Sequence, residues 1–434
     1  MNSIERLYQV FVSCSGVTTD SREIKGGELF IGLKGDRFDG NQYATQALEK
    51  GASYAMVDDP GLANGARYLL VEDTLEALQK LGRHHRRQFD IPVVGITGSN
   101  GKTTTKELVA AVLGQKYKLH FTPGNFNNHI GVPLTLLAMP GDTELAVIEM
   151  GANHQGEIDE LSRIAEPSHG LITNIGKAHL EGFGGIEGVK KGKSELYRFL
   201  SGVDGLVFIN QDEHFLEGLA ASCKRQVLYG SGALKATDYI PVELTAEQPF
   251  LTFAFADPIS GARVESGSNL IGRYNFNNIM TAVALGIHFG VPGDKIKAGV
   301  EAYLPENMRT QMLEKGGNTY FMDAYNANPT SMGNAIMAFA QMEAMQRIAI
   351  LGEMLELGAD SGMEHEAIVE LAQKQPIDTV VLVGPAFEQP AKEAGLHHFP
   401  NVQALRSWFD GQQFNGVHFM IKGSRSNKLE DLIS

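Results

Sequence analysis

VVGITGSNGKTTTKELVAAVL, residues 93–113, decides the fold of this chain. Its apolar, β-branched start predicts a buried strand at 93–97, and an amphipathic helix is expected from Lys102 onward. A glycine-rich turn between a strand and a helix is typical of a phosphate-binding loop. The usual first glycine is displaced, because Ile96 stands where it is expected and Gly95 precedes it. A turn that only resembles such a loop is the alternative, and the flanking strand and helix argue against it.

Each residue type in this loop suits one part of a nucleoside triphosphate. Gly98 and Gly101 let the backbone curl so that successive N–H groups point inward, and the helix N-terminus adds its positive dipole end. We expect Lys102 to lie along the β- and γ-phosphates and the Thr103 hydroxyl to bind Mg²⁺. The residues expected to bind the nucleotide here are Gly98, Asn100, Gly101, Lys102, Thr103 and Thr104.

Length and composition describe a globular chain of several domains. Its 434 residues exceed what one hydrophobic core usually serves. A formal net charge of −14 argues against nucleic acid or an anionic membrane as a partner. The two cysteines are too few for a disulfide framework, and residues 1–16 lack the long apolar core of a secretory signal. We therefore expect a cytoplasmic protein that does not enter a membrane, and a monomer.

The alternation of strands and helices predicts three α/β domains, at 1–90, 91–304 and 305–434. The first is small. The second alternates predicted strands with predicted helices, the strands at 93–97, 145–149, 170–174 and 205–209 and the helices at 102–113, 157–165, 186–200 and 213–221. That pattern predicts a doubly wound, mainly parallel sheet, to which an antiparallel meander at 238–271 is added. The third domain opens with a hairpin that turns at Gly316 and continues as a Rossmann-like α/β domain.

Polar side chains follow several of the predicted strands, at the edge where ligands bind in such sheets. Glu149 ends one strand and is expected to hold Mg²⁺ together with Thr103. His179 follows the next strand, which favours a role at the site over a structural one. Asn277 or Asn278, in the first turn of a later predicted helix, is placed to reach a nucleotide base.

Two basic runs receive separate interpretations. HHRR at 84–87 ends a predicted helix at 74–89 and is interpreted as a solvated charged face. KGSRSNK places Lys422, Arg425 and Lys428 on a loop before a helix, an arrangement that suits an anion.

Four groups of motifs, in chain order, carry a resemblance to a known family. They are TDSR with GELFIGLKGDRFDGN, then GITGSNGKTTTKE, then GNFNNHIGVPLTLL with EMGANHQGEI, and finally DAYNANPTSM with LGEMLELG. With them, essentially the whole chain resembles a Mur ligase. The resemblance implies that the three domains bind, in order, a UDP-sugar, ATP with Mg²⁺, and the incoming amino acid or dipeptide. It also implies that ATP converts a carboxylate into an acyl phosphate, which an amine then attacks.

The resemblance also implies roles for single residues. Two Mg²⁺ ions are implied, the first held by Thr103 and Glu149. The second is held by His179 and Lys193, with Lys193 carbamylated so that it becomes a carboxylate-like ligand. Without the resemblance, Lys193 reads as an ordinary solvated charge. Lys102, His179 and Lys193 are the expected catalytic residues. Further residues that match the family are Asn278, Arg309 and Asp323 near the nucleotide, Ser21 and Arg22 at the UDP-sugar, and Asn326, Asn328 and Glu356 at the incoming amine.

Within the family, the third domain separates the possible substrates. The Asp-Asn-Pro-Arg motif expected of the member that adds diaminopimelate or lysine is absent from the sequence, whereas a YNANP loop begins at Tyr325. The resemblance therefore implies that D-alanyl-D-alanine is joined to UDP-N-acetylmuramoyl-tripeptide in peptidoglycan precursor synthesis. The alternatives are the diaminopimelate- or lysine-adding member, a kinase with the same loop, and a nucleotide-dependent regulatory module.

Overall fold

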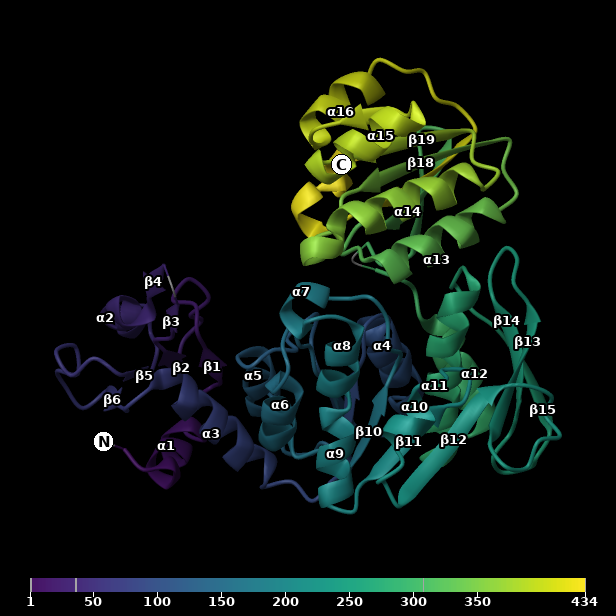
Figure 1. Cartoon of the computed structure of the whole chain (residues 1–434). Helices are drawn as coiled ribbons and strands as arrows, with labels where there is room; N and C mark the ends of the chain where they lie inside the picture. Colours follow the sequence, from purple (N-terminus) through teal and green to yellow (C-terminus); the bar gives the residue numbers. More distant parts are fainter. Residues whose placement is uncertain (1, 36, 307, 434) are drawn as a thin grey trace.

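The computed structural model describes residues 2–35, 37–306 and 308–433, and it contains three α/β domains (Figure 1). In Figure 1 the N-terminal domain lies to one side of the central domain, and the C-terminal domain lies above the central one. The predicted three-domain α/β fold is confirmed. Its predicted boundaries at residues 90 and 304 stay predictions.

The N-terminal domain is built on a small sheet. Its helices and strands are α1 (Ile4–Phe11), β1 (Val17–Thr18), β2 (Leu29–Ile31), β3 (Lys34–Gly35), β4 (Phe38–Asp39), η1 (Gly40–Tyr43), α2 (Ala44–Glu49), β5 (Tyr54–Val57), β6 (Tyr68–Leu70) and α3 (Thr74–Arg86). The parallel sheet has the order β1-β2-β5-β6, and β3 pairs with β4 in a separate two-stranded ribbon.

The central domain contains a nine-stranded sheet. Its elements are β7 (Val93–Thr97), α4 (Lys102–Leu113), β8 (Leu119–Phe121), α5 (Gly131–Leu137), β9 (Leu145–Glu149), α6 (Glu157–Ala165), β10 (His169–Ile172), α7 (Leu180–Phe183), α8 (Ile186–Lys193), α9 (Glu195–Gly202), β11 (Leu206–Asn210), α10 (Leu216–Leu219), β12 (Arg225–Ser231), β13 (Ile240–Ala246), β14 (Thr252–Ala256), β15 (Arg263–Gly267), η2 (Arg273–Asn275), α11 (Phe276–His288) and α12 (Gly293–Ala302). The strand order is β15-β14-β13-β12-β11-β10-β7-β9-β8. Within this order, each pair of neighbouring strands between β13 and β8 is parallel. Strands β13, β14 and β15 form the predicted antiparallel meander.

Two predicted helices of the central domain differ from the structure. The helix expected at 186–200 is two helices, α8 and α9, which meet at Ser194. The Ser194 hydroxyl donates to the carbonyl oxygen of Lys191 at 2.9 Å, a local bond that competes with the helical pattern. The helix expected at 213–221 is only α10, because the side chain of Asn210 accepts from the N–H of Asp212 and holds the preceding residues in a turn.

The C-terminal domain contains a six-stranded sheet. Its elements are β16 (Gln311–Lys315), β17 (Asn318–Asp323), α13 (Pro329–Ala340), β18 (Gln346–Gly352), η3 (Gly358–Asp360), α14 (Ser361–Gln373), β19 (Thr379–Val383), η4 (Pro385–Phe387), α15 (Glu388–Ala394), β20 (His397–Phe399), α16 (Val402–Phe409), β21 (Val417–Lys422), η5 (Arg425–Asn427) and η6 (Leu429–Leu432). The order is β16-β17-β21-β18-β19-β20, with only β16 antiparallel to its neighbour. The predicted hairpin is β16 and β17.

Helix α3 joins the N-terminal domain to the central domain. A Cβ at Gly82 would lie 2.9 Å from Pro133 Cα, so α3 packs closely on α5. The interpretation of the HHRR run as a solvated face is wrong for Arg86, which is 8% exposed and donates to the carbonyl oxygens of Ala165 and Glu166. These carbonyls end α6 and need donors, which is the reason that an arginine is buried there.

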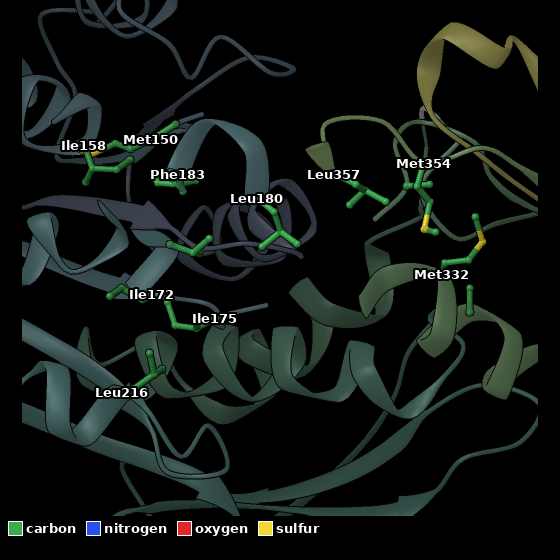
Figure 2. Packing of buried hydrophobic residues seen from close by; sticks show 14 of the residues in the cluster. Met150, Ile158, Ile172, Ile175, Leu180, Phe183, Leu216, Met332, Met354 and Leu357 are labelled. Carbon is green, nitrogen blue, oxygen red and sulfur yellow. The ribbon is translucent and has the colours of Figure 1, made fainter. Parts of the chain in front are cut away.

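One hydrophobic cluster extends from the central domain into the C-terminal domain (Figure 2). Met150, Ile172 and Leu180 belong to it on the central side, and Met332 and Leu357 on the C-terminal side. Burial of a large apolar side chain stabilises a fold by roughly 1.5–3 kcal/mol. The shared cluster therefore holds the two domains in this arrangement. Helix α7 of the central domain contacts η3 of the C-terminal domain.

No helix in the described part of the chain is suited to crossing a membrane. None of these helices is both long enough and apolar enough.

Candidate active site

A cavity of about 520 Å³ lies between the central and C-terminal domains. Its central-domain wall is the edge of the sheet where β7, β9 and β10 end, which is where ligands bind in doubly wound folds. Residues of the C-terminal domain form the opposite wall. The predicted site residues that line it are Asn100, Gly101, Lys102, Thr103, Thr104, Glu149, His179, Asn278, Arg309, Asp323, Asn326 and Asn328.

The phosphate loop, residues 98–103, requires its two glycines. Gly98 has φ +146° and Gly101 has φ +77°, conformations that other residues rarely adopt. A Cβ at Gly98 would lie 2.0 Å from Thr173 Oγ1, and a Cβ at Gly101 would lie 2.6 Å from Asn278 Oδ1. The loop therefore owes its shape both to positive φ angles and to the close approach of neighbouring side chains.

The side chain of Asn278 packs against the phosphate loop at Gly101. Its Oδ1 accepts from the Thr105 hydroxyl at 2.9 Å, and its Nδ2 donates to Asn275 Oδ1 at 2.9 Å. Both ends of its amide are thus bonded within the protein. The neighbouring Asn277 instead donates to Glu213 Oε1 at 3.1 Å. A contact between Asn278 and the nucleotide stays a prediction.

Lys102 is the first residue of α4 and lies over the phosphate loop. Its Nζ donates to the carbonyl oxygens of Gly98 at 2.8 Å and Ser99 at 3.2 Å. Desolvation by the surrounding protein lowers the pKa of Lys102, the negative charge of Glu149 opposes this, and the positive charge of Arg309 adds to it. An ammonium group held at this loop is placed to bind phosphate oxygens.

Thr103 and Glu149 form an arrangement that fits a divalent cation. Glu149 is 1% exposed, and its Oε1 accepts from the Thr103 hydroxyl at 3.1 Å and from Asn127 Nδ2 at 2.7 Å. Its Oε2 is buried and accepts no hydrogen bond from any described residue, and the ammonium of Lys106 lies 3.8 Å away. A buried carboxylate oxygen without a donor is costly unless a cation binds it. The pair therefore suits Mg²⁺, which binds hydroxyl, carboxylate and phosphate oxygens.

The predicted second metal site is less complete. Within the described residues, no group of three or more His, Cys, Asp or Glu side chains is arranged to hold a metal ion. A second Mg²⁺ held by His179 and Lys193 therefore stays a prediction. His179 Nδ1 is hydrogen-bonded to Glu356 Oε2 of the C-terminal domain. Glu356 was predicted at the incoming amine and His179 at the second Mg²⁺. This hydrogen bond therefore joins residues of two predicted sites.

Lys193 is not the solvated charge that its sequence context indicates. It is the last residue of α8, is 1% exposed, and donates from Nζ to the carbonyl oxygen of Ala152 at 3.2 Å. Burial lowers the pKa of Lys193 well below its usual range, and the positive charge of Lys102 acts in the same direction. Burial therefore favours the neutral amine form of this side chain over the ammonium form.

The C-terminal wall carries residues that pair with one another. Asn328 caps α13, since its Oδ1 accepts from the N–H of Ser331 at 2.9 Å, and its Nδ2 donates to Asn100 Oδ1 at 2.7 Å. Asp323 ends β17 and accepts from Lys422 Nζ at 2.6 Å. Lys422 is therefore not a free cation on a loop, as was expected for the KGSRSNK run. It ends β21, the neighbour of β17, and short 3-10 turns follow in place of the expected helix.

Two arginines flank Tyr325 at this wall. The guanidinium carbon of Arg309 lies 3.6 Å from the centre of the Tyr325 ring, and that of Arg425 lies 5.2 Å from it. Asn326 Oδ1 accepts locally from the N–H of Ala327 at 2.9 Å. The wall is therefore positively charged where Arg309 faces the cavity, which suits an anionic ligand.

The remaining predicted residues lie outside the cavity wall; they are Gly98, Lys193, Glu356, Ser21 and Arg22. Ser21 and Arg22 belong to the N-terminal domain. The Ser21 hydroxyl donates to Gln46 Oε1 at 3.2 Å, and exposed Arg22 pairs with Asp20 at 2.7 Å.

Models of one family match all three domains. Residues 13–86 match "Mur ligase family, catalytic domain", residues 96–286 match "Mur ligase middle domain", and residues 308–425 match "Mur ligase, glutamate ligase domain". A UDP-N-acetylmuramoyl-tripeptide–D-alanyl-D-alanine ligase of Bacillus subtilis is 37% identical over 429 residues, which span 96% of this chain and 92% of that protein. This chain belongs to the Mur ligase family.

Solved structures of Mur ligases share the whole architecture. MurF from Acinetobacter baumannii superposes with a TM-score of 0.86 at 31% identity, covering 99% of this chain and 97% of that one. A MurF ligase from Thermotoga maritima in complex with ADP gives a TM-score of 0.82 at 25% identity, covering 100% and 97%. The fold resemblance therefore extends over all three domains of this Mur ligase.

Sequence reasoning missed two residues that hold the site of this Mur ligase. Asn127 bonds Glu149, and Lys106 is completely buried with its Nζ donating to the carbonyl oxygen of Gly124 at 2.8 Å. Both lie in motifs that carried the resemblance, GNFNN and TTTKE. Lys106 also stands four residues after Lys102, so both lie on one helix face, a spacing that signals a shared environment.

Proposed function

We propose that this Mur ligase joins D-alanyl-D-alanine to UDP-N-acetylmuramoyl-tripeptide at the expense of ATP, in cytoplasmic peptidoglycan precursor synthesis. The observation that carries the proposal is the 37% identity over 429 residues to the Bacillus subtilis ligase of that name. The cavity supports it, because a phosphate loop and a candidate cation site face a second, positively charged wall across one space.

Each domain then has one task. The N-terminal domain binds the UDP-sugar with Ser21 and Arg22, the central domain binds ATP, and the C-terminal domain binds the dipeptide. The placement of the cavity supports this division, since the ends of β7 and β9 meet the C-terminal wall there. The amine can thus approach the γ-phosphate side of the nucleotide from the opposite domain.

The reaction has two steps. The muropeptide carboxylate attacks the γ-phosphorus of ATP, which gives an acyl phosphate and ADP. The dipeptide amine then attacks the acyl carbon, and inorganic phosphate leaves. The N–H groups of the phosphate loop and the ammonium of Lys102 hold the transferring phosphoryl group and stabilise charge that develops on its oxygens.

Mg²⁺ supplies further neutralisation of phosphate charge when it is bound. Thr103 and Glu149 would hold the first ion, and the unpartnered Oε2 of Glu149 supports that role. His179 would hold the second through Nε2, because a histidine whose Nδ1 contacts a carboxylate presents its other nitrogen as a ligand.

Carbamylated Lys193 would be the other ligand of the second ion. A neutral lysine amine attacks the carbon of CO₂ and releases a proton, which leaves a carbamate with two oxygen donors. Burial lowers the pKa of Lys193 and so favours the neutral amine, which supports the proposal.

Measurement of ADP release with single substrates omitted tests the function. We expect steady ADP release only when the UDP-muramoyl tripeptide and D-alanyl-D-alanine are both present, together with ligated product. Steady ADP release without the amine would contradict ligation and favour a kinase.

A further inference from the structure

Residues 353–357 of the C-terminal domain, the segment between β18 and η3, contact the central domain at α7. The carbonyl oxygen of Glu356 accepts from the N–H of Glu181 at 3.2 Å, and the Glu356 carboxylate is hydrogen-bonded to His179. Leu357 is buried in the cluster that the two domains share (Figure 2). The position of segment 353–357 therefore affects how the C-terminal domain meets the central domain beside His179.

Side chains from outside segment 353–357 hold its backbone in place. Glu356 has φ +62°, a left-handed conformation that is uncommon for residues other than glycine and that persists only where the surroundings fix it. The N–H of Leu355 donates to the Ser424 hydroxyl oxygen at 3.2 Å. The N–H of Met354 donates to Nε2 of His365 at 3.0 Å. The two residues that precede Glu356 are thus each anchored by a side chain.

The hydrogen bonds of His365 determine which of its ring nitrogens carries the proton. His365 lies in α14, is completely buried, and packs edge-on against Phe387 with the ring centres 4.6 Å apart. Because the N–H of Met354 can only donate, Nε2 accepts and the proton is on Nδ1, which donates to the carbonyl oxygen of Ser361 at 2.7 Å. The uncharged ring therefore uses one nitrogen within its own helix and the other to hold segment 353–357.

The surroundings of His365 favour this uncharged form. Desolvation by burial lowers the pKa of His365, whereas its bond to Ser361 and the negative charges of Glu353 and Glu364 oppose that shift. A protonated ring would place an N–H at Nε2 against the N–H of Met354, and the hydrogen bond to segment 353–357 would be lost. Burial therefore favours the form of the ring that accepts from Met354.

The residue before His365 contacts the central domain directly. Lys177, between β10 and α7, donates from Nζ to Oε1 of the buried Glu364 at 2.5 Å. The same part of α14 therefore pairs with the central domain through Glu364 and holds segment 353–357 through His365.

We propose that His365 is a positioning residue that holds segment 353–357, and with it Glu356, against α7 of the central domain. It acts through the backbone of Met354 and does not line the cavity. The proposal rests on the proposed function only in that Glu356 then serves the incoming amine. Loss of the bond to Met354 should loosen the contact between Glu356 and Glu181 and weaken the capture of the dipeptide.

Two amide substitutions separate the two hydrogen bonds of His365. In His365→Gln the amide oxygen reaches the place of Nε2 and accepts from Met354, whereas the shorter side chain of His365→Asn reaches only Ser361. His365→Leu is a second variant without the bond to Met354. Val369→Ala, one turn later on α14, removes buried methyl groups and is the control for a general loss of stability.

Hydrogen–deuterium exchange of the full chain, resolved to the amide of Glu181, measures the domain contact without any substrate. We expect this amide to exchange about fivefold faster or more in His365→Asn and His365→Leu, and within about twofold of the native rate in His365→Gln and Val369→Ala. The kcat/KM for D-alanyl-D-alanine should fall by about fivefold or more in the first two variants only.

A native exchange rate at Glu181 in a folded His365→Asn or His365→Leu would overturn the proposal. Exchange in His365→Gln as fast as in His365→Asn would also overturn it, because the acceptor for Met354 would then be irrelevant. Equally fast exchange in Val369→Ala would assign the effect to general destabilisation and overturn the proposal as well. The expected exchange rates in a native chain that forms no ligated product would instead contradict the proposed function.

Discussion

Asn328 Nδ2 donates a hydrogen bond to Asn100 Oδ1 at 2.7 Å, across 228 positions of sequence. One residue thus caps helix α13 of the C-terminal domain and contacts the phosphate loop of the central domain. The hydrogen bond couples the position of one domain to the loop that would hold the nucleotide.

Asn328→Ser separates these two roles. Serine caps a helix about as well as asparagine, but its side chain is too short to reach Asn100. We expect an unchanged melting temperature and a kcat/KM for ATP that is lower by roughly two- to tenfold, the range for one hydrogen bond of about 0.5–1.5 kcal/mol. Asn401→Ser, at the cap of α16, is the control and should keep native kinetics. Native kinetics in Asn328→Ser would show that the bridge is dispensable.

Lys102→Ala should lower turnover by at least about 100-fold, because a charged contact to the transferring phosphoryl group is lost. The fold should persist, since the removed bonds are two local ones to loop carbonyls. ADP release and circular dichroism measure the two effects. Lys80→Ala, on an exposed face of α3, should behave like the native chain. If turnover of Lys102→Ala stays within a few-fold of the native value, the assignment of residues 98–103 as the phosphate-binding loop would be wrong.

Lys193→Ala should lose most activity, and removal of CO₂ from the buffer should lower the activity of the native chain reversibly. Both follow from a carbamate on this buried amine, and bicarbonate should restore the native chain but not the variant. Lys191→Ala on the same helix removes an exposed lysine and should change little. Native-like activity of Lys193→Ala would exclude the carbamate role.

The incoming amine should be D-alanyl-D-alanine. Diaminopimelate carries a second charged end that requires its own partner, and leaving such groups unpaired costs a few kcal/mol. We expect competition at equal concentrations with the muramoyl tripeptide to yield mainly the dipeptide product. Preferential ligation of diaminopimelate, lysine or D-glutamate would assign the chain to another Mur ligase activity.

The free energy of unfolding should depend on pH through Glu213. Its pKa is raised from 4.5 to about 7, so the folded chain binds this proton more tightly than the unfolded chain. The linked stabilisation is present in full below pH 4.5 and is lost as the pH rises through 7, by at most about 3 kcal/mol. Urea denaturation of Glu213→Gln, relative to the native chain, should therefore show a gain of about 1–3 kcal/mol between pH 4 and pH 8. Glu217→Gln should show no such gain, and a pH-independent difference for Glu213→Gln would contradict the shift.

The local sequence pattern was sufficient to predict the phosphate loop and the strands and helix around it. The strand before Gly98, the helix from Lys102 and the strand that ends at Glu149 all appear where the sequence predicts them. Hydrophobic periodicity and the backbone freedom of glycine act over a few residues, so a short stretch contains all the information they need.

The sequence alone thus determined the three-domain α/β architecture and the position of the phosphate loop. Only the tertiary structure decided that Lys193 and Arg86 are buried and that Lys422 is paired with Asp323. It also decided that Glu213 is desolvated beside Asn277. The physical reason is that the charge state and the partner of a side chain depend on which distant segments exclude water around it, and residue type and spacing do not specify those segments.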